Sequence, residues 1–285
     1  MDATVGTTVP RVAHEERGPI VYRHTVTTRL THWLSALALV ILVASGLQIF
    51  NAAPYLDASD KTDPARRVLQ IGAGTDASGG ATGTTVIFGH TFRTTHLLGY
   101  TDNGMGEQSQ RAFPAWLTLP GYQDLADGRR WHLFFAWIFT LCGVAYIVAG
   151  VLRKDLADLV LRPSDLPKLW PMQAYYLRLR SEPPAHGKYN PLQKMAYTLV
   201  LFVFSPLIVL SGLALSPGID AIAGPLTTAF GGRQFARLWH FVFMVALLGF
   251  FGVHLVLVAS TGVLNNLRSM ILGTYRVGKH EGTGP

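Results

Sequence analysis

The chain has 285 residues, of which 49% are hydrophobic and only 14% are charged. Soluble domains usually carry about 25% charged residues, so the composition argues against a soluble protein. The formal net charge is +7, but the charges are unevenly placed and better explained by membrane topology, so no nucleic-acid partner is expected. The single cysteine, Cys142, excludes a disulfide within the chain and a CxxCH haem attachment.

Four long uncharged runs predict transmembrane helices, because about 20 apolar residues suffice to cross a bilayer. The expected spans are residues 30–50, 132–152, 195–217 and 239–265. We therefore expect an all-α fold, a four-helix bundle that forms one membrane domain over residues 1–285. Within the third span, Pro206 should kink the helix or leave a carbonyl without its donor.

The connections between the expected spans differ in length and composition. Residues 51–130 are rich in Gly, Thr and Asp and form a long outer loop, in which residues 85–88 predict a short strand. His90 and His96 lie in this loop and are interpreted as surface or structural residues, because no ligand spacing surrounds them. The linker from Arg153 to Lys194 is basic and aromatic, and its first part suits a short amphipathic helix along the membrane surface.

The distribution of charge predicts the orientation in the membrane. With both termini inside, the inner segments carry fifteen Lys and Arg against eight Asp and Glu, whereas the outer segments carry nine of each. Basic residues concentrate on the cytoplasmic side, which favours an N-in, C-in protein. We expect a multi-pass protein of the bacterial inner membrane, in contact with lipid.

The fourth run, which begins at Trp239, holds two histidines, His240 and His254. At 1.5 Å and 100° per residue they lie roughly 21 Å apart along the axis and within roughly 40° of one face. Gly249 and Gly252 lie between them and remove bulk, which would let a flat ligand approach the backbone. Ionisable groups inside a span are costly and usually functional, so we interpret both histidines as metal ligands. Alternatively, they bond neighbouring helices.

Two further histidines stand at the start of other spans. In the N-in topology His32 starts near the inside and His132 near the outside, so the four histidines sort into two level-matched pairs, His132 with His240 and His32 with His254. Two neutral imidazoles fill both axial positions of a haem, which suits electron transfer. Zinc would want four ligands at one point, and the spacing in the fourth run makes a shared site implausible.

Arginines flank these histidines. Arg29, Arg130 and Arg237 stand beside ligands and are candidates to pair with haem propionates. The alternative role, that of interface anchors and topology signals, suits each of them equally well.

The sequence also contains an internal repeat. VASGL at 43–47 resembles VLSGL at 209–213, and RRWH at 129–132 resembles RLWH at 237–240. The two pairs of segments fall at corresponding places, which predicts two related helical hairpins.

These motifs resemble the four-helix di-haem cytochrome b family, which forms the membrane subunit of bacterial formate dehydrogenases, nickel–iron hydrogenases and thiosulfate reductases. The resemblance rests on RLTHW in the first span, RRWH in the second, GKYNPLQK before the third, and LWH with His254 fourteen residues on in the fourth. It implies two haem b groups held by the four histidines, and a molybdopterin or iron–sulfur redox subunit at the outer face.

The same resemblance implies a quinone site at the start of the third span. GKYNPLQK would supply Asn190, Tyr189, Gln193 and Lys194, with Asn190 bonding a quinone carbonyl and Lys194 supporting proton uptake. The alternative, compatible role of Asn190 is a helix N-cap, with Pro191 at the first helical position.

Our leading hypothesis is an electron-transfer subunit of an oxidoreductase complex, rather than a self-contained enzyme, that joins an outer redox partner to the quinone pool. A stand-alone superoxide or ferric reductase is an alternative. A histidine-relay transporter or proton channel is a weaker one, because the spans hold few polar residues.

Overall fold

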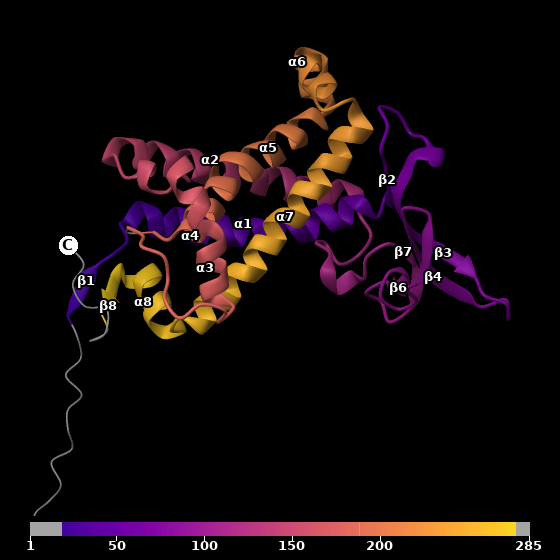
Figure 1. The fold of residues 1–285 in the computed structure, drawn as a ribbon. Coiled ribbons are helices and arrows are strands. Elements are labelled where there is room, and N and C mark those ends of the chain that lie inside the picture. Colours follow the sequence, from indigo (N-terminus) through magenta and orange to yellow (C-terminus); the bar gives the residue numbers. More distant parts are fainter. Residues whose placement is uncertain (1–18, 188, 278–285) are drawn as a thin grey trace, which may run out of the picture.

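Four long helices dominate the computed structural model, which describes residues 19–187 and 189–277 (Figure 1). They are α1 (Val26–Phe50), α2 (Leu125–Arg153), the continuous segment Pro191–Ala214, and α7 (Arg233–Ser260). With 25, 29, 24 and 28 residues, each is long and apolar enough to cross a membrane. The four predicted helices are therefore confirmed.

The long helices form two hairpins. Helix α1 packs along α2, and α5 (Ser205–Ala214) packs along α7. Contacts between the two hairpins are sparser than those within them. In Figure 1, α7 crosses the direction of α1 at a steep angle, so the hairpins are not laid parallel.

Local capping explains where three of these helices begin. The Thr25 side chain accepts a hydrogen bond from the backbone N–H of Thr28, and Asp124 accepts one from Asp127. Asn190 and Gln193 form a reciprocal capping box, with a proline at the first helical position. Such caps satisfy N–H groups that have no partner within the helix.

The third span changes its winding halfway. Between α4 (Pro191–Leu199) and α5 lies a π-helical turn, η5 (Val200–Phe204), and Pro206 follows it directly. Proline lacks the N–H that an α-helix would donate to an earlier carbonyl, and π turns occur where the regular ladder is interrupted. The sequence prediction of a local disturbance at Pro206 matches this turn.

One expectation about the second hairpin was wrong. The fourth span was expected to reach residue 265, but α7 ends at Ser260, and Gly262 (φ +98°) turns the chain into a separate helix, α8 (Val263–Leu272). Helix α6 (Pro217–Ala229) lies in the connection that precedes α7. Glycine adopts a positive φ without strain, which explains why the helix breaks at Gly262.

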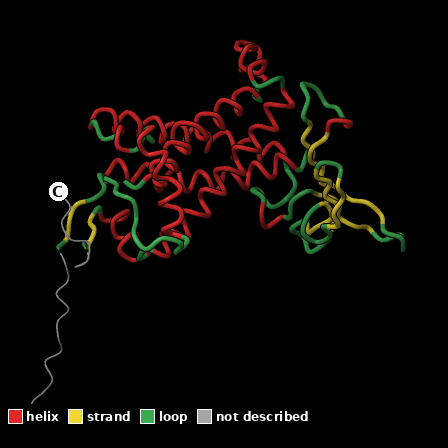
Figure 2. The backbone as a smooth tube through the Cα atoms, in the orientation of Figure 1, coloured by secondary structure: helices red, strands yellow, loops and turns green. Residues whose placement is uncertain are grey.

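The all-α expectation was also wrong, because the insertion over residues 51–130 is built largely of strands (Figure 2). An antiparallel sheet runs in the order β2-β3-β4-β5, and a two-stranded ribbon pairs β6 with β7. The predicted strand at residues 85–88 lies mostly within β4. The strands are β2 (Tyr55–Asp57), β3 (Arg67–Thr75), β4 (Ala81–Ile87), β5 (His90–Arg93), β6 (Gly99–Asp102) and β7 (Gln108–Arg111).

Short elements complete the fold. Short 3₁₀-helices lie beside the strands and in the linker: η1 (Pro64–Arg66), η2 (Ala115–Leu117), η3 (Leu156–Asp158) and η4 (Pro163–Lys168). The first part of the linker, for which a short amphipathic helix was predicted, forms η3 and η4 instead, and helix α3 (Leu169–Tyr176) follows them. Strands β1 (Ile20–Tyr22) and β8 (Thr274–Arg276) pair antiparallel, so the two ends of the described chain lie together.

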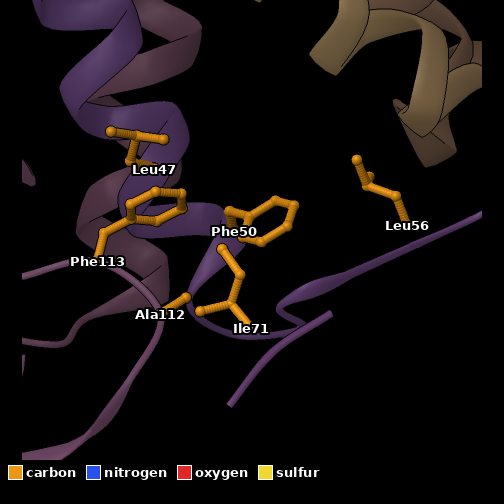
Figure 3. Packing of buried hydrophobic residues seen from close by; sticks show 6 residues of the cluster. All are labelled: Leu47, Phe50, Leu56, Ile71, Ala112 and Phe113. Atoms are coloured by element: carbon orange, nitrogen blue, oxygen red, sulfur yellow. The ribbon is translucent and has the colours of Figure 1, made fainter. Parts of the chain in front are cut away.

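A buried apolar cluster joins the end of α1 to the insertion (Figure 3). Its members are Leu47, Phe50, Leu56, Ile71, Ala112 and Phe113. Burying one large apolar side chain stabilises a fold by about 1.5–3 kcal/mol, so this cluster anchors the strands to the helix end.

Arg111 reinforces the same junction from the last residue of β7. It is only 3% exposed, and its guanidinium donates to the carbonyl oxygens of Phe113 and Gly121 and to the side chains of Gln48 and Thr118. Burial lowers the pKa of Arg111, and the carboxylate of Asp102 partly opposes that shift. The insertion is thus a structured unit held on the end of α1.

Candidate functional site

The four histidines of the spans meet in two pairs. The ring centroids of His132 and His240 lie 6.1 Å apart, with an angle of 63° between the ring planes. Those of His32 and His254 lie 6.2 Å apart, at 59°. In each pair one histidine comes from the first hairpin and the other from α7, so each pair bridges the two hairpins.

The spacing within each pair suits one metal between two rings. An imidazole nitrogen binds a first-row metal at about 2 Å, so two rings on opposite sides of one metal have centroids about 6 Å apart. Direct edge contact between aromatic rings covers the same range, so distance alone does not decide between these arrangements. The hydrogen bonds of the rings add the chemical argument.

The Nδ1 atom of His132 is held by α1. It lies 3.1 Å from the carbonyl oxygen of Leu42 and 3.1 Å from the hydroxyl oxygen of Ser45. A backbone carbonyl only accepts hydrogen bonds, so the hydrogen sits on Nδ1 and the lone pair is on Nε2. Histidines that bind metals show this arrangement, in which the second nitrogen donates to a carbonyl.

His240 repeats this arrangement on the other hairpin. Its Nδ1 lies 3.0 Å from the carbonyl oxygen of Ile208 and 3.0 Å from the hydroxyl oxygen of Ser211, both on α5. The two Nε2 atoms of this pair therefore both carry free lone pairs. A pair of neutral imidazoles in this tautomer fits the axial ligands of a haem iron.

A glycine follows each serine and makes room for the ring. A Cβ atom on Gly46 would come within 3.3 Å of Cε1 of His132, and one on Gly212 within 3.2 Å of Cε1 of His240. The sequence reasoning missed Ser45, Ser211 and these glycines as functional residues. Their signal was present in the repeated VASGL and VLSGL segments, which we had interpreted only as related hairpins.

The second pair is held differently. The Nδ1 atom of His32 is buried without a hydrogen-bond partner among the residues that the structure describes, and the Trp33 ring meets the His32 ring edge-on at 5.3 Å. The His254 ring stacks on Phe250, with centroids 5.8 Å apart. This pair keeps the two-ring geometry but lacks the paired serines.

Neither pair belongs to a larger ligand cluster. Over residues 19–187 and 189–277, no three His, Cys, Asp or Glu side chains gather where they could hold one metal ion. Tetrahedral zinc needs four ligands, whereas haem iron needs only two from the protein. The donor set therefore fits haem and not zinc.

Comparison with known proteins agrees with this geometry. The profile of the prokaryotic cytochrome b561 family matches residues 23–273, which is most of the chain. The chain belongs to the prokaryotic cytochrome b561 family. This confirms the cytochrome b resemblance and makes the chain a membrane electron-transfer subunit of the cytochrome b561 type, a family that binds haem b.

A curated relative supports the assignment. The chain is 29% identical over 253 residues to a protein of Azospira oryzae described as a putative protein-methionine-sulfoxide reductase subunit YedZ1. The match covers 86% of this cytochrome b561 and 93% of the relative. The likeness thus extends over most of this chain and nearly the whole of the relative.

The three arginines predicted beside the ligands differ in their surroundings. Arg29 donates to the carbonyl of Ile271 at the end of α8, and its Nε is buried without a partner among the described residues. Arg237 donates to the carbonyl of Ala53 and lies over two aromatic rings of the insertion junction. Arg130 is 80% exposed and pairs with Asp127 at 2.9 Å. Of the three, Arg29 retains a buried donor for an anionic group.

The residues predicted for quinone binding lie at the start of α4. Asn190 serves as the N-cap, as the alternative interpretation held, and its amide also donates to the Tyr176 hydroxyl at 3.2 Å. Gln193 completes the cap, and Lys194 forms an ion pair with Asp165 at 3.0 Å. The ring of Tyr189 meets Tyr197 edge-on at 5.5 Å.

His90 and His96 lie in the insertion, away from the paired histidines. His90 begins β5 and is exposed, and His96 lies 3.4 Å from the Gln108 side chain through Nδ1. Both match the prediction of surface or structural roles.

Proposed function

We propose that this cytochrome b561 holds two haem b groups and passes electrons between a redox partner at the insertion end and the membrane quinone pool. The observation that carries the proposal is the pair of matched histidine couples, each bridging the two hairpins at the same ring spacing. The two histidines of each couple would hold one haem, and a haem held by two imidazoles would supply one-electron transfer rather than oxygen activation.

The chain's own residues define the two proposed sites. His132 and His240 would hold the haem nearer the insertion, each fixed in one tautomer by a carbonyl and a serine. His32 and His254 would hold the haem nearer the paired termini. Arg29, Arg130 and Arg237 are the proposed partners of the propionates, with Arg29 favoured because its Nε is buried and unpaired among the described residues.

The proposed quinone site is formed by Asn190, Tyr189, Gln193 and Lys194. One N–H of the Asn190 amide is used by Tyr176, which leaves the other for a quinone carbonyl. Lys194 and its partner Asp165 form a charged pair at the start of the span and would exchange protons with the reduced quinone. In this proposal, capping and quinone contact are roles of the same asparagine.

The partner is proposed from the relative's name and from the insertion. YedZ1 is named as a putative subunit of a methionine-sulfoxide reductase, and by analogy we propose a catalytic oxidoreductase subunit with molybdopterin or iron–sulfur centres. It would dock at the outer face, against the β-sheet insertion. The protein would lie in the bacterial inner membrane with both termini inside, as the excess of inner basic residues favours.

A haem assay of histidine variants tests this proposal. The purified protein should contain two haems and give a bis-histidine b-type spectrum on reduction. His132→Ala or His240→Ala should remove one haem and spare the other, whereas His32→Ala or His254→Ala should remove the second. His90→Ala, on the exposed strand β5, should retain both. A protein with no b-type signal, or His132→Ala and His240→Ala variants with two haems, would contradict the proposal.

A further inference from the structure

The hydroxyl of Ser45 donates its one hydrogen to a backbone carbonyl and not to the histidine. The hydroxyl lies 2.6 Å from the carbonyl oxygen of Ile41, a short bond along its own helix. A serine hydroxyl has a single hydrogen but two lone pairs. The contact of 3.1 Å with Nδ1 of His132 is therefore made by a lone pair of the serine, which accepts from the imidazole N–H.

Ser211 has the same role on α5. Its hydroxyl donates to the carbonyl of Ile208 at 3.0 Å, which leaves a lone pair for Nδ1 of His240 at 3.0 Å. Both serines are fully buried, with 0% of each exposed. Each imidazole N–H of this pair is thus shared between two acceptors, a carbonyl and a hydroxyl, in an environment where hydrogen bonds are strengthened.

Within the part of the chain that the structure describes, the other histidine pair has no such acceptors. Over the described residues, Nδ1 of His32 is buried without a partner and no side-chain hydrogen bond reaches His254. The two pairs match in ring spacing but differ in what holds the ligand N–H. This difference is electronic, because an acceptor on Nδ1–H makes the Nε2 lone pair a stronger donor to the metal.

We infer that Ser45 and Ser211 are positioning residues that lower the reduction potential of the haem held by His132 and His240, and so make the two haem sites unequal. The inference rests on the proposed function, in which the paired histidines are the haem ligands. A stronger donor stabilises ferric over ferrous iron, and hydrogen bonds outside the ligand shell are an established lever on haem potential.

The test is a spectroscopic redox titration of Ser45→Ala, Ser211→Ala and the double variant. Because the carbonyls of Leu42 and Ile208 remain as acceptors, both rings should stay in place and the haem content should remain at two. The midpoint potential of one haem should shift in the positive direction, further in the double variant than in either single one. The other potential should not move.

Two further variants assign and control the shift. In a His32→Ala background, which should lack the second haem, the shifted potential should be the one that remains. Thr140→Val removes a hydroxyl of α2 whose one hydrogen bond within residues 19–187 and 189–277 is to the carbonyl of Ala136, so it should leave both potentials unchanged. Ser45→Cys keeps the shape of the side chain, with a somewhat larger atom that is only a weak acceptor, so it should shift the potential like alanine without creating a cavity.

The outcomes separate this inference from the proposed function. Unchanged potentials in the double variant, with two haems present, would overturn the inference and leave the proposed function standing. Equal shifts in both haems, or loss of haem from both the alanine and the cysteine variants, would overturn it too, because the serines would then be structural. Retention of both haems in His132→Ala and His240→Ala would instead overturn the proposed function.

Discussion

At the scale of single residues, Gly46 and Gly212 provide space that no other residue type can. An alanine Cβ at either position would press on Cε1 of the adjacent histidine at 3.2–3.3 Å, tighter than ordinary contact. We expect Gly46→Ala and Gly212→Ala to displace the rings and weaken haem binding by about 1–3 kcal/mol, the usual cost of overpacking. The measurement is the haem-to-protein ratio after purification and haem titration.

A matched substitution separates this effect from the general influence of alanine on helices. Gly218 lies on α6 with open space around its Cβ direction, so Gly218→Ala should keep both haems. Full haem occupancy in the Gly46→Ala and Gly212→Ala double variant would show that the rings have room to move, contrary to this argument.

Arg111 is the second residue whose removal has a definite expected cost. Arg111→Met would remove the donor to the buried carbonyl of Phe113 and to the partly buried carbonyl of Gly121, and each unsatisfied buried group costs about 1–3 kcal/mol. We expect a loss of at least about 2–3 kcal/mol of stability at the junction of the insertion and α1. Thermal unfolding and limited proteolysis within residues 51–124 would detect it.

The control for this prediction is Arg93→Met. Arg93 lies on β5, and its side chain is 73% exposed, so its replacement should change stability little. Equal losses from the two substitutions would argue against a special role for the buried guanidinium.

The sequence predicted the paired histidines better than the side chains that hold their rings. His240 and His254 stand out because a long uncharged run makes any ionisable group conspicuous. Ser45 and Ser211 do not stand out, because serines in membrane helices commonly bond back to their own helix, as both also do. Only the geometry reveals that their remaining lone pairs face imidazoles.

At the scale of elements, the helices were predictable and the strands were not. Each transmembrane helix corresponds to a run of about 20 apolar residues, a pattern that few other structures produce. The strands of the insertion have three to nine residues, and β3 and β4 are rich in glycine and threonine, so alternation of apolar and polar residues is weak. The end of α7 was misjudged because α8 continues the apolar composition past Gly262.

The linker between the hairpins supplies a prediction about pH. Asp165 on η4 accepts from the backbone N–H of Arg162 and pairs with Lys194 on α4, and these two contacts, in that order, hold the pKa of Asp165 below its usual range. A carboxyl whose pKa is lower in the folded state stabilises above its unfolded pKa, and that stability is lost as pH falls through the folded pKa.

We therefore expect Asp165→Asn to lower the unfolding temperature at neutral pH, with the difference from the parent protein shrinking below about pH 4. Thermal unfolding in detergent across pH 3–7 is the measurement. A difference that is constant with pH would mean that the substitution acts through packing, and not through the charge of Asp165.

At the scale of the whole molecule, the two ends of the described chain lie together while the insertion lies at the opposite end of the long helices (Figure 1). Because β1 and β8 pair, the chain between them must cross the membrane an even number of times. The four spans meet this requirement. The linker with α3 should share the side of the termini, and the insertion should face the other side. The excess of basic residues on the segments that join the termini and the linker favours the inside for the termini.

Cysteine accessibility tests this orientation. In a Cys142→Ala background, which removes the buried native thiol, Arg93→Cys in the insertion and Arg180→Cys in the linker each add one exposed thiol. A membrane-impermeant maleimide should label the insertion cysteine from the periplasmic side of intact cells. It should reach the linker cysteine only after the membrane is opened, whereas the reverse pattern would place the proposed partner in the cytoplasm. Labelling of both in intact cells would contradict an arrangement in which four helices separate the insertion from the linker.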